Sequence, residues 1–146
     1  MKHILMIATG GTIASRQSGR GLAPSLTGDE LLEFIPDLSR ICKVVVENPM
    51  SLDATDMTAN DRMQIAEMIW KNYPLYDGFV IAHGTDTLSY TAALLYHVLR
   101  NFNKPVVITG AQIPLGMPDS DAEQNLIDAF KVASSAYCGV SAVLHR

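Results

Sequence analysis

The chain has 146 residues, of which 48% are hydrophobic and 18% charged, and its formal net charge is −4. This composition is typical of one globular domain with a substantial core and argues against a disordered chain. The net charge is negative and the sequence contains no basic stripe, which argues against a nucleic-acid surface. No apolar run approaches the roughly 18 residues that span a bilayer.

Two further features bear on where the protein acts. The apolar run between Lys2 and Thr9 is shorter than the roughly 7 residues that a signal peptide needs, which argues against secretion. The cysteines, Cys42 and Cys138, have neither CxxC spacing nor a histidine cluster nearby. We therefore expect two buried free thiols, no metal site and a cytoplasmic protein.

Short runs rich in Val and Ile predict strands that are covered on both faces. These runs are residues 3–8, 41–46, 78–82, 105–109 and 139–144. The segments between them have helical spacing of apolar residues. This alternation predicts an α/β domain in three layers, with a mainly parallel sheet and helices on both faces.

The helical segments differ in the strength of their signals. A weak helix is expected over about 28–35, and the run 88–99 is apolar almost all round, which predicts a buried helix. Two others begin at expected capping boxes, Thr58 with Asp61 and Ser120 with Glu123. The buried faces expected for these two are Met63, Ala66, Ile69, Trp70 and Tyr73 in the first, and Leu126, Ala129, Phe130 and Ala133 in the second.

One polar, glycine-rich stretch, residues 15–25, interrupts the alternation. Its composition is compatible with a solvated hairpin or loop. It is equally compatible with a mobile lid beside Thr12, because lids often have this composition.

Three strands end alike, with Thr9-Gly10, His83-Gly84 and Thr109-Gly110. In a parallel sheet the loops after these strands emerge at one edge, where open α/β sheets bind ligands. We therefore expect the side chains that follow to converge although they lie far apart in sequence. These residues are Thr12, Thr85, Asp86, Ala111 and Gln112.

The residues of the first two loops suggest nucleophile chemistry. Thr12 follows two glycines whose backbone N–H groups could stabilise an oxyanion, and a threonine nucleophile requires a nearby base or positioned water. Taken alone, Thr-Gly-Gly-Thr at 9–12 is also compatible with a tight turn, and Asp86 or Thr87 with a helix cap. A structural role for His83 is favoured over a catalytic one. Neither loop has the lysine of a P-loop or the third glycine of a dinucleotide fingerprint.

The two loops together resemble the N-terminal domain of the bacterial-type L-asparaginases, in the cytosolic type I branch. The resemblance covers nearly the whole chain and suggests that residues 1–146 form this domain, without the family's C-terminal domain. The segments that carry it are residues 9–14, 52–57, 77–87, 104–114 and 120–126.

The resemblance implies hydrolysis of L-asparagine, and of L-glutamine more slowly, to the acid and ammonia. Thr12 would be the nucleophile that forms an acyl-enzyme, and Thr85 and Asp86 would belong to a Thr-Lys-Asp relay. Asp86 would also hold the substrate's α-amino group. The substrate-binding residues would be Gly11, Ala54, Thr55, Gly84, Asp86 and Ala111. No cofactor or metal is implied.

The sequence departs from the family pattern in three ways. Ala54 stands where the family usually has serine, and Thr55 is a candidate to supply the missing hydroxyl. Leu22 occupies the position of a lid tyrosine that many members carry. The family's catalytic lysine lies beyond the segment that matches residues 139–146, and Lys104 and Lys131 occur in the wrong contexts to replace it.

Two other functions remain open. The same fold occurs in the asparaginase-like subunit of tRNA-dependent amidotransferases, although the acidic charge argues against tRNA binding. The chain could also be a catalytically impaired domain that binds asparagine or aspartate. The family domain continues into further strands, so we expect an unpaired sheet edge after residue 144 and self-association into a homo-oligomer. We expect no nucleic-acid or membrane partner.

Overall fold

The computed structural model of the protein describes residues 1–18, 21–24 and 26–145. Its centre is a five-stranded sheet with the strand order β4-β1-β5-β6-β7, in which every neighbouring pair is parallel. The strands are β1 (His3–Ala8), β4 (Lys43–Glu47), β5 (Gly78–Ala82), β6 (Pro105–Thr109) and β7 (Gly139–Ala142). The predicted α/β class and parallel sheet are confirmed.

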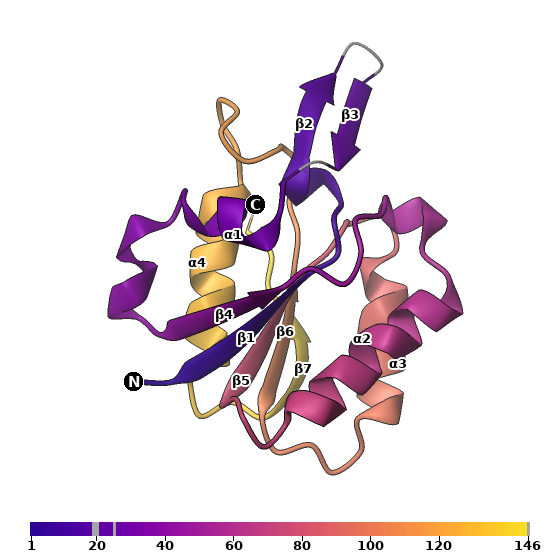
Figure 1. Ribbon diagram of the computed structural model, residues 1–146, viewed down its shortest axis with the longest axis vertical. Helices are drawn as coiled ribbons and strands as arrows, with labels where there is room; N and C mark the ends of the chain where they lie inside the picture. Colours follow the sequence, from indigo (N-terminus) through magenta and orange to yellow (C-terminus); the bar gives the residue numbers. More distant parts are fainter. Residues whose placement is uncertain (19–20, 25, 146) are drawn as a thin grey trace.

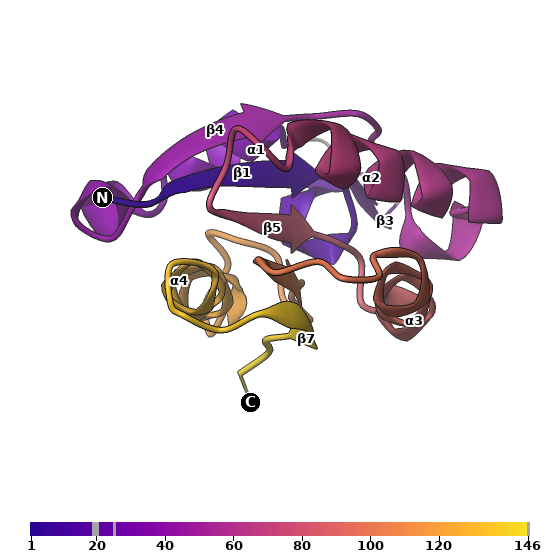
Figure 2. The same ribbon diagram turned by 90° about the horizontal axis from the view of Figure 1, so that it is seen from below.

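Helices cover both faces of the sheet (Figures 1 and 2). On one face, α1 (Gly28–Leu32) and α4 (Ala122–Ala133) enclose a core with β1, β5 and β6. On the other, α2 (Ala59–Asn72) and α3 (Leu88–Val98) enclose a second core. The predicted three-layer arrangement is confirmed.

Burial along the strands follows their place in the sheet. The central strands β5 and β6 are buried at every residue, because helices cover both of their faces. β4 lies at an edge and alternates between exposed and half-buried residues. The predicted bounds of 3–8, 78–82 and 105–109 match the structure. The two remaining runs shift at their ends, to Lys43–Glu47 and Gly139–Ala142.

The helix predictions are confirmed at some ends and wrong at others. Thr58 and Asp61 form the predicted capping box of α2, with the Asp61 N–H donating to Thr58 Oγ1. At α4, the N-cap residue is Asp121, so the predicted box with Ser120 is wrong by one position. The weak helix is also shorter than expected, because α1 ends at Leu32 and a separate 3₁₀ turn, Pro36–Arg40, begins at the proline.

The predicted buried faces of the three long helices are confirmed to different extents. The apolar face of α4 is confirmed, since all four of its predicted residues are buried. In α2, Ala66 and Ile69 are buried but Met63 and Trp70 are exposed. In α3, the prediction of a helix buried all round is wrong. Tyr90 and Tyr96 are 69% and 68% exposed, because α3 covers the sheet with one face only.

Residues in the polar stretch form an antiparallel hairpin of β2 (Ser15–Ser18) and β3 (Gly21–Pro24). This agrees with the hairpin interpretation, while residues 19, 20 and 25 and the side chain of Leu22 lie outside what the structure describes. Cys42 and Cys138 are free, but Cys138 is exposed, so the expectation of two buried thiols is wrong for that residue. In the described ranges, no helix is long and apolar enough to cross a membrane.

Candidate active site

The order of the strands creates a switch point between β1 and β5. From β1 the chain passes to β4 on one side, and it then returns to β5 on the other side. Crevices at such points, beyond the carboxyl ends of the strands, are the usual ligand sites of open α/β sheets. The two hydroxyl-rich loops, 9–12 and 83–87, follow these two strands. The predicted convergence therefore lies at the switch point.

Backbone hydrogen bonds hold the loop that carries Thr12. The Thr9 N–H donates to the Ala82 carbonyl at 3.0 Å, which extends the pairing of β1 with β5 into the loop. The Leu52 N–H donates to the Thr9 carbonyl at 2.9 Å, and the Gly11 N–H donates back to the Leu52 carbonyl at 3.0 Å. Loop 9–12 is thus held between Leu52 and the end of β5.

Glycines allow the loops to approach each other closely. Gly11 has φ +81°, and a Cβ there would lie 2.4 Å from the Cα and N of Gly84. A Cβ on Gly84 would lie 2.6 Å from the Cβ of Ala54. Real Cβ atoms do not approach other heavy atoms this closely, so these positions exclude side chains. The loops that carry Thr12 and Thr85 therefore pack backbone against backbone, and the Ala54 methyl group packs against the Gly84 backbone.

Thr12 begins a short 3₁₀ turn, Thr12–Ala14, directly after Gly11. The turn is anchored by the buried side chain of Ile13 and by two hydrogen bonds to the Gly11 carbonyl, from the Ala14 N–H at 3.1 Å and from Ser15 Oγ at 2.7 Å. Thr12 itself is half-buried. Its position in the fold is therefore set by buried neighbours, while its side chain retains access to solvent.

The loop after β6 joins the other two. The His83 N–H donates to the Thr109 carbonyl at 2.9 Å, and a Cβ on Gly110 would lie 2.4 Å from the His83 carbonyl oxygen. Gln112 Nε2 donates to Thr85 Oγ1 at 3.2 Å. Thr85 is half-buried, whereas the Asp86 carboxylate is exposed to solvent. Ala111, one of the predicted binding residues, is buried beneath this edge.

Two side chains near the start of α4 hold the loop after β6 in place. Asp121 accepts hydrogen bonds from the N–H groups of Gln112 and Ile113 at 3.0–3.1 Å, and Asn125 Nδ2 donates to the Gly110 carbonyl at 2.8 Å. Burial would raise the pKa of Asp121, but these N–H donors outweigh it and hold the pKa below its ordinary value. A polar residue, Asn125, on an otherwise apolar helix face is the sequence signal that could have indicated this contact, and the structure shows that Asn125 is buried.

The segment with Ala54 and Thr55 forms a second 3₁₀ turn, Ala54–Asp56, with Asp53 as its N-cap. Thr55 donates to Asp53 Oδ1 from both its N–H, at 3.0 Å, and its hydroxyl, at 2.9 Å. These bonds lower the pKa of Asp53. The Thr55 hydroxyl thus donates its proton within its own turn.

Thr87 also has a different role from the predicted one. It is the N-cap residue of α3, but its side chain makes no capping hydrogen bond. Instead, Thr87 Oγ1 donates to the Ala54 carbonyl at 2.7 Å. The hydroxyl therefore ties loop 83–87 to the Ala54–Asp56 turn.

The two lysines weighed in the sequence lie away from these loops. Lys104 precedes β6, where its Nζ donates to the carbonyls of Tyr73 and Tyr76 near the amino ends of the strands. Lys131 pairs with Asp128 on α4, with 3.2 Å between Nζ and Oδ1. Neither supplies a cation to the threonine loops. Among the described residues, no group of three or more His, Cys, Asp and Glu side chains is placed to hold a metal ion.

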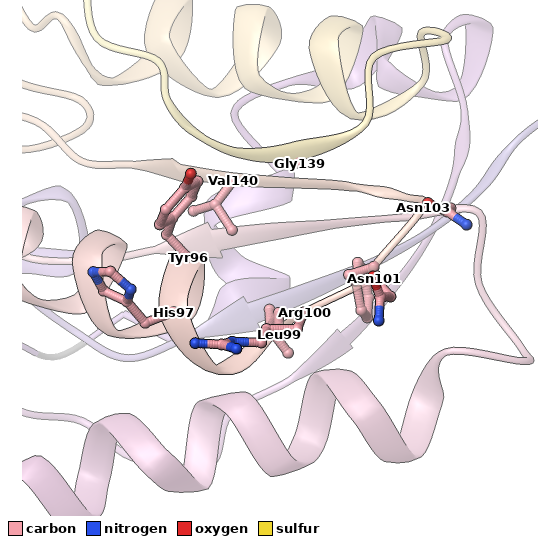
Figure 3. A pocket seen from close by; sticks show the side chains of 9 residues that line it. Tyr96, His97, Leu99, Arg100, Asn101, Asn103, Gly139 and Val140 are labelled. Atoms are coloured by element: carbon pink, nitrogen blue, oxygen red, sulfur yellow. The ribbon is translucent and has the colours of Figure 1, made fainter.

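A cavity of about 580 Å³ lies elsewhere on the molecule, between the end of α3 and the start of β7 (Figure 3). Its lining includes Arg100, Asn103 and Gly139, which lie at the amino ends of β6 and β7. The threonine loops lie at the carboxyl ends, so this cavity is separate from the candidate active site.

Comparisons with known proteins show the family of this chain. The asparaginase N-terminal family model matches residues 3–146. The chain belongs to the asparaginase family. Escherichia coli L-asparaginase 1 is 42% identical over 139 residues, which cover 92% of this chain and 41% of that protein. The crystal structure of L-asparaginase I from Vibrio cholerae superposes with a TM-score of 0.84 and 36% identity, covering 99% of this chain and 44% of that one.

These matches confirm the resemblance to the type I branch of the asparaginase family. A further relative is a subunit of the glutamyl-tRNA(Gln) amidotransferase of Pyrococcus abyssi, which is 38% identical over 149 residues, covering 99% of this chain and 34% of that protein. The chain therefore spans about two fifths of the length of its asparaginase relatives.

Proposed function

We propose that this asparaginase-family chain provides the nucleophile and substrate-binding loops for hydrolysis of L-asparagine to L-aspartate and ammonia. The observation that carries this proposal is the close approach of Gly11 to Gly84, which brings the loop of Thr12 against that of Thr85 and Asp86. Two hydroxyls and a carboxylate thereby share one edge of the sheet. The relatives named L-asparaginase support asparagine as the substrate.

In the proposed reaction, Thr12 Oγ attacks the side-chain amide carbon of the substrate. The hydroxyl proton passes to the departing nitrogen, the C–N bond breaks, and ammonia leaves an acyl-enzyme on Thr12. Water then attacks the ester and releases L-aspartate, returning the proton to Thr12. Backbone N–H groups of the loops would stabilise the oxyanion of each step. Thr85 and Asp86 would take part in the proton relay.

The binding of the substrate's amino-acid end follows from the charges and donors of these loops. Asp86 is exposed at the edge of the site and would pair with the α-amino group. The α-carboxylate would rely on backbone N–H groups near Gly11, Gly84 and Thr55, because Ala54 has no hydroxyl and the Thr55 hydroxyl donates to Asp53. Ala111 would contact the scissile amide. L-Glutamine, which is one methylene longer, would react more slowly.

The relay that the family resemblance implies also needs a lysine, and the threonine loops contain none. General acid–base groups contribute on the order of 10²–10⁴ in rate. We therefore expect slow turnover from the 146-residue chain. No cofactor or metal is required by this scheme.

The test measures ammonia released from L-asparagine by the unchanged chain and by Thr12→Ala and Thr12→Ser. We expect Thr12→Ala to abolish the activity and Thr12→Ser to retain part of it, since only serine keeps a hydroxyl nucleophile. Equal rates for the unchanged chain and Thr12→Ala would disprove the role of Thr12. Binding of L-aspartate without any ammonia release would instead identify a binding domain without catalytic activity.

The match to an amidotransferase subunit supports a second candidate function. In that case the same loops would release ammonia from an amide for use on charged tRNA. The net charge of −4 argues against direct tRNA binding by this chain. Stimulation of ammonia release by glutamyl-tRNA(Gln) would favour this function over that of a free-standing asparaginase.

We also propose that the chain forms a homo-oligomer in the cytoplasm. Among the described strands, β4 and β7 form the two edges of the sheet, and a sheet edge can pair with another chain. Sedimentation at micromolar concentrations should show self-association. A strictly monomeric profile would contradict this.

A further inference from the structure

We propose that Arg62, Thr91 and His83 form a directed chain of hydrogen bonds that sets the position of the two substrate-binding loops relative to each other. The loops are residues 54–57 and 83–86, and their role in binding rests on the proposed function. Each of the three residues lies on a different element: Arg62 on α2, Thr91 on α3 and His83 after β5. They are positioning residues, because they would act on the substrate only through the loops that they contact.

Two of the three residues are buried, and the hydrogen bonds between them are short. His83 and Thr91 are fully inaccessible to solvent. Arg62 Nε donates to Thr91 Oγ1 at 3.0 Å, Thr91 Oγ1 lies 2.7 Å from His83 Nε2, and His83 Nδ1 lies 2.6 Å from the Gly84 carbonyl oxygen. Both ring nitrogens of His83 are therefore engaged, one with α3 and one with the loop.

The chemistry of these groups fixes the direction of every hydrogen bond. The Gly84 carbonyl can only accept, so His83 Nδ1 must carry a proton. Arg62 can only donate, so Thr91 Oγ1 accepts from it and keeps its own proton for His83 Nε2. The other acceptor near Thr91, Met57 Sδ, is 3.8 Å away and weak. His83 is thus neutral and held in its Nδ1–H tautomer.

Electrostatics favour the same state. Burial lowers the pKa of His83, and the nearby charge of Arg62 lowers it further, against an opposite effect of the hydrogen bond to Gly84. A neutral ring keeps a lone pair on Nε2, which is the acceptor that Thr91 needs.

Arg62 connects this chain of hydrogen bonds to the other loop, residues 54–57. Its Nη1 donates to the Met57 carbonyl at 2.9 Å, and the Met57 N–H donates to the Ala54 carbonyl, closing the Ala54–Asp56 turn. One guanidinium thus contacts the end of the first loop directly and the second loop through Thr91 and His83. A planar side chain with several donors in fixed directions suits this double role better than lysine would.

The first experiment reads the ring of His83 in the unchanged 146-residue chain by ¹⁵N NMR at neutral pH. We expect a protonated Nδ1 and an unprotonated Nε2. The other histidines, His3, His97 and His145, are exposed and provide spectra of solvated rings for comparison. An Nε2–H tautomer or a charged ring would overturn the proposal, and this result does not depend on any variant or on any activity.

The second experiment compares Thr91→Val, which removes the hydroxyl at similar volume, with Thr91→Ser, which keeps it. We expect Thr91→Val to shift the amide resonances of both loops, 54–57 and 83–86, and to weaken L-aspartate binding on the order of ten-fold. Thr91→Ser should restore both readouts. Equal loop shifts in the two variants would overturn the proposal, because they would reflect lost packing instead of the lost hydroxyl.

The two readouts separate this proposal from the proposed function. If the unchanged chain does not bind L-aspartate, the substrate assignment fails, while the ring spectrum and the loop resonances still decide the positioning chain. If Thr91→Val does not fold, the ring spectrum of the unchanged chain decides it alone.

Discussion

Two loops of the candidate active site are held in different ways. Loop 9–12, with Thr12, is held by backbone hydrogen bonds to Leu52 and by the contact of Gly11 with Gly84. Loop 110–113, with Ala111, begins with a similar backbone contact between Gly110 and His83, but the side chains of Asp121 and Asn125 hold the rest of it. A side chain added where two backbones touch causes a clash, whereas the loss of one side-chain hydrogen bond removes only part of the stabilisation. We therefore expect loop 9–12 to tolerate fewer substitutions than the loop after β6.

The largest effect should come from Gly11→Ala. The new Cβ would meet the Gly84 backbone at 2.4 Å, and φ of +81° strains any L-residue. Such a backbone conformation costs about 1–3 kcal/mol by itself, and the clash adds to it. We expect the free energy of unfolding in urea to fall by more than about 3 kcal/mol.

Gly116→Ala is the matched control for this substitution. Gly116 has the same φ of +81°, but a Cβ there would meet only the Phe34 side chain, at 3.2 Å. Its cost should be that of the backbone strain, about 1–3 kcal/mol, with only a small displacement of the Phe34 ring. Similar losses in the two variants would show that the contact between Gly11 and Gly84 is looser than the structure indicates.

The difference between the loops also explains what could be predicted from the sequence. Strand positions such as 78–82 and 105–109 were predictable, because strands covered on both faces appear as continuous apolar runs. The approach of the loops that carry Thr12 and Thr85 was predictable from the shared strand endings and parallel topology. The backbone contact through Gly11 could only be anticipated in general terms, since glycine marks a close approach without naming its partner.

The wrong predictions for the helices share a physical cause. The periodicity of apolar residues does not reveal which neighbour covers a helix. The face of α4 was predicted because Leu126 and Phe130 contrast with charged residues around them. α3 offers little such contrast, so the exposure of Tyr90 and Tyr96 could not be seen. Similarly, nothing local shows that Thr87 donates to Ala54 instead of capping α3, because that choice depends on tertiary contact.

A smaller effect is expected from Asp121→Asn in the loop after β6. The carboxylate accepts hydrogen bonds from the N–H groups of Gln112 and Ile113 and from Asn125. Hydrogen bonds to charged groups contribute about 1.5–3 kcal/mol, and asparagine keeps one acceptor oxygen, so we expect a loss of about 1–2 kcal/mol in urea unfolding. Asp119→Asn, at an exposed neighbouring position, should change stability little.

The same variant has a defined pH dependence. The folded-state pKa of Asp121 is lowered, so its stabilising effect is complete above the ordinary value of about 3.8 and is lost as the pH falls through the lower folded-state pKa. The stability difference between the unchanged chain and Asp121→Asn should therefore shrink in acid. A difference that stays constant on acidification would contradict the role of the carboxylate charge.

The smallest effect should come from Gln112→Ala. Gln112 is exposed, and its side chain donates one hydrogen bond, at 3.2 Å, to Thr85 Oγ1. We expect stability to change by less than about 0.5 kcal/mol, as for most exposed substitutions. Gln64→Ala, at an exposed position on α2, is the control.

Gln112→Ala should nevertheless affect the site more than the fold. Because the amide nitrogen only donates, it occupies a lone pair of Thr85 and leaves that hydroxyl's proton free for a substrate or water. Without it the Thr85 hydroxyl can rotate, so we expect ammonia release, or L-aspartate binding where release is too slow to measure, to fall a few-fold, about the effect of one neutral hydrogen bond. A stability loss as large as that of Asp121→Asn would mean that the exposed Gln112 amide also stabilises the loop after β6, in contradiction to the role in the site alone that we assign to it.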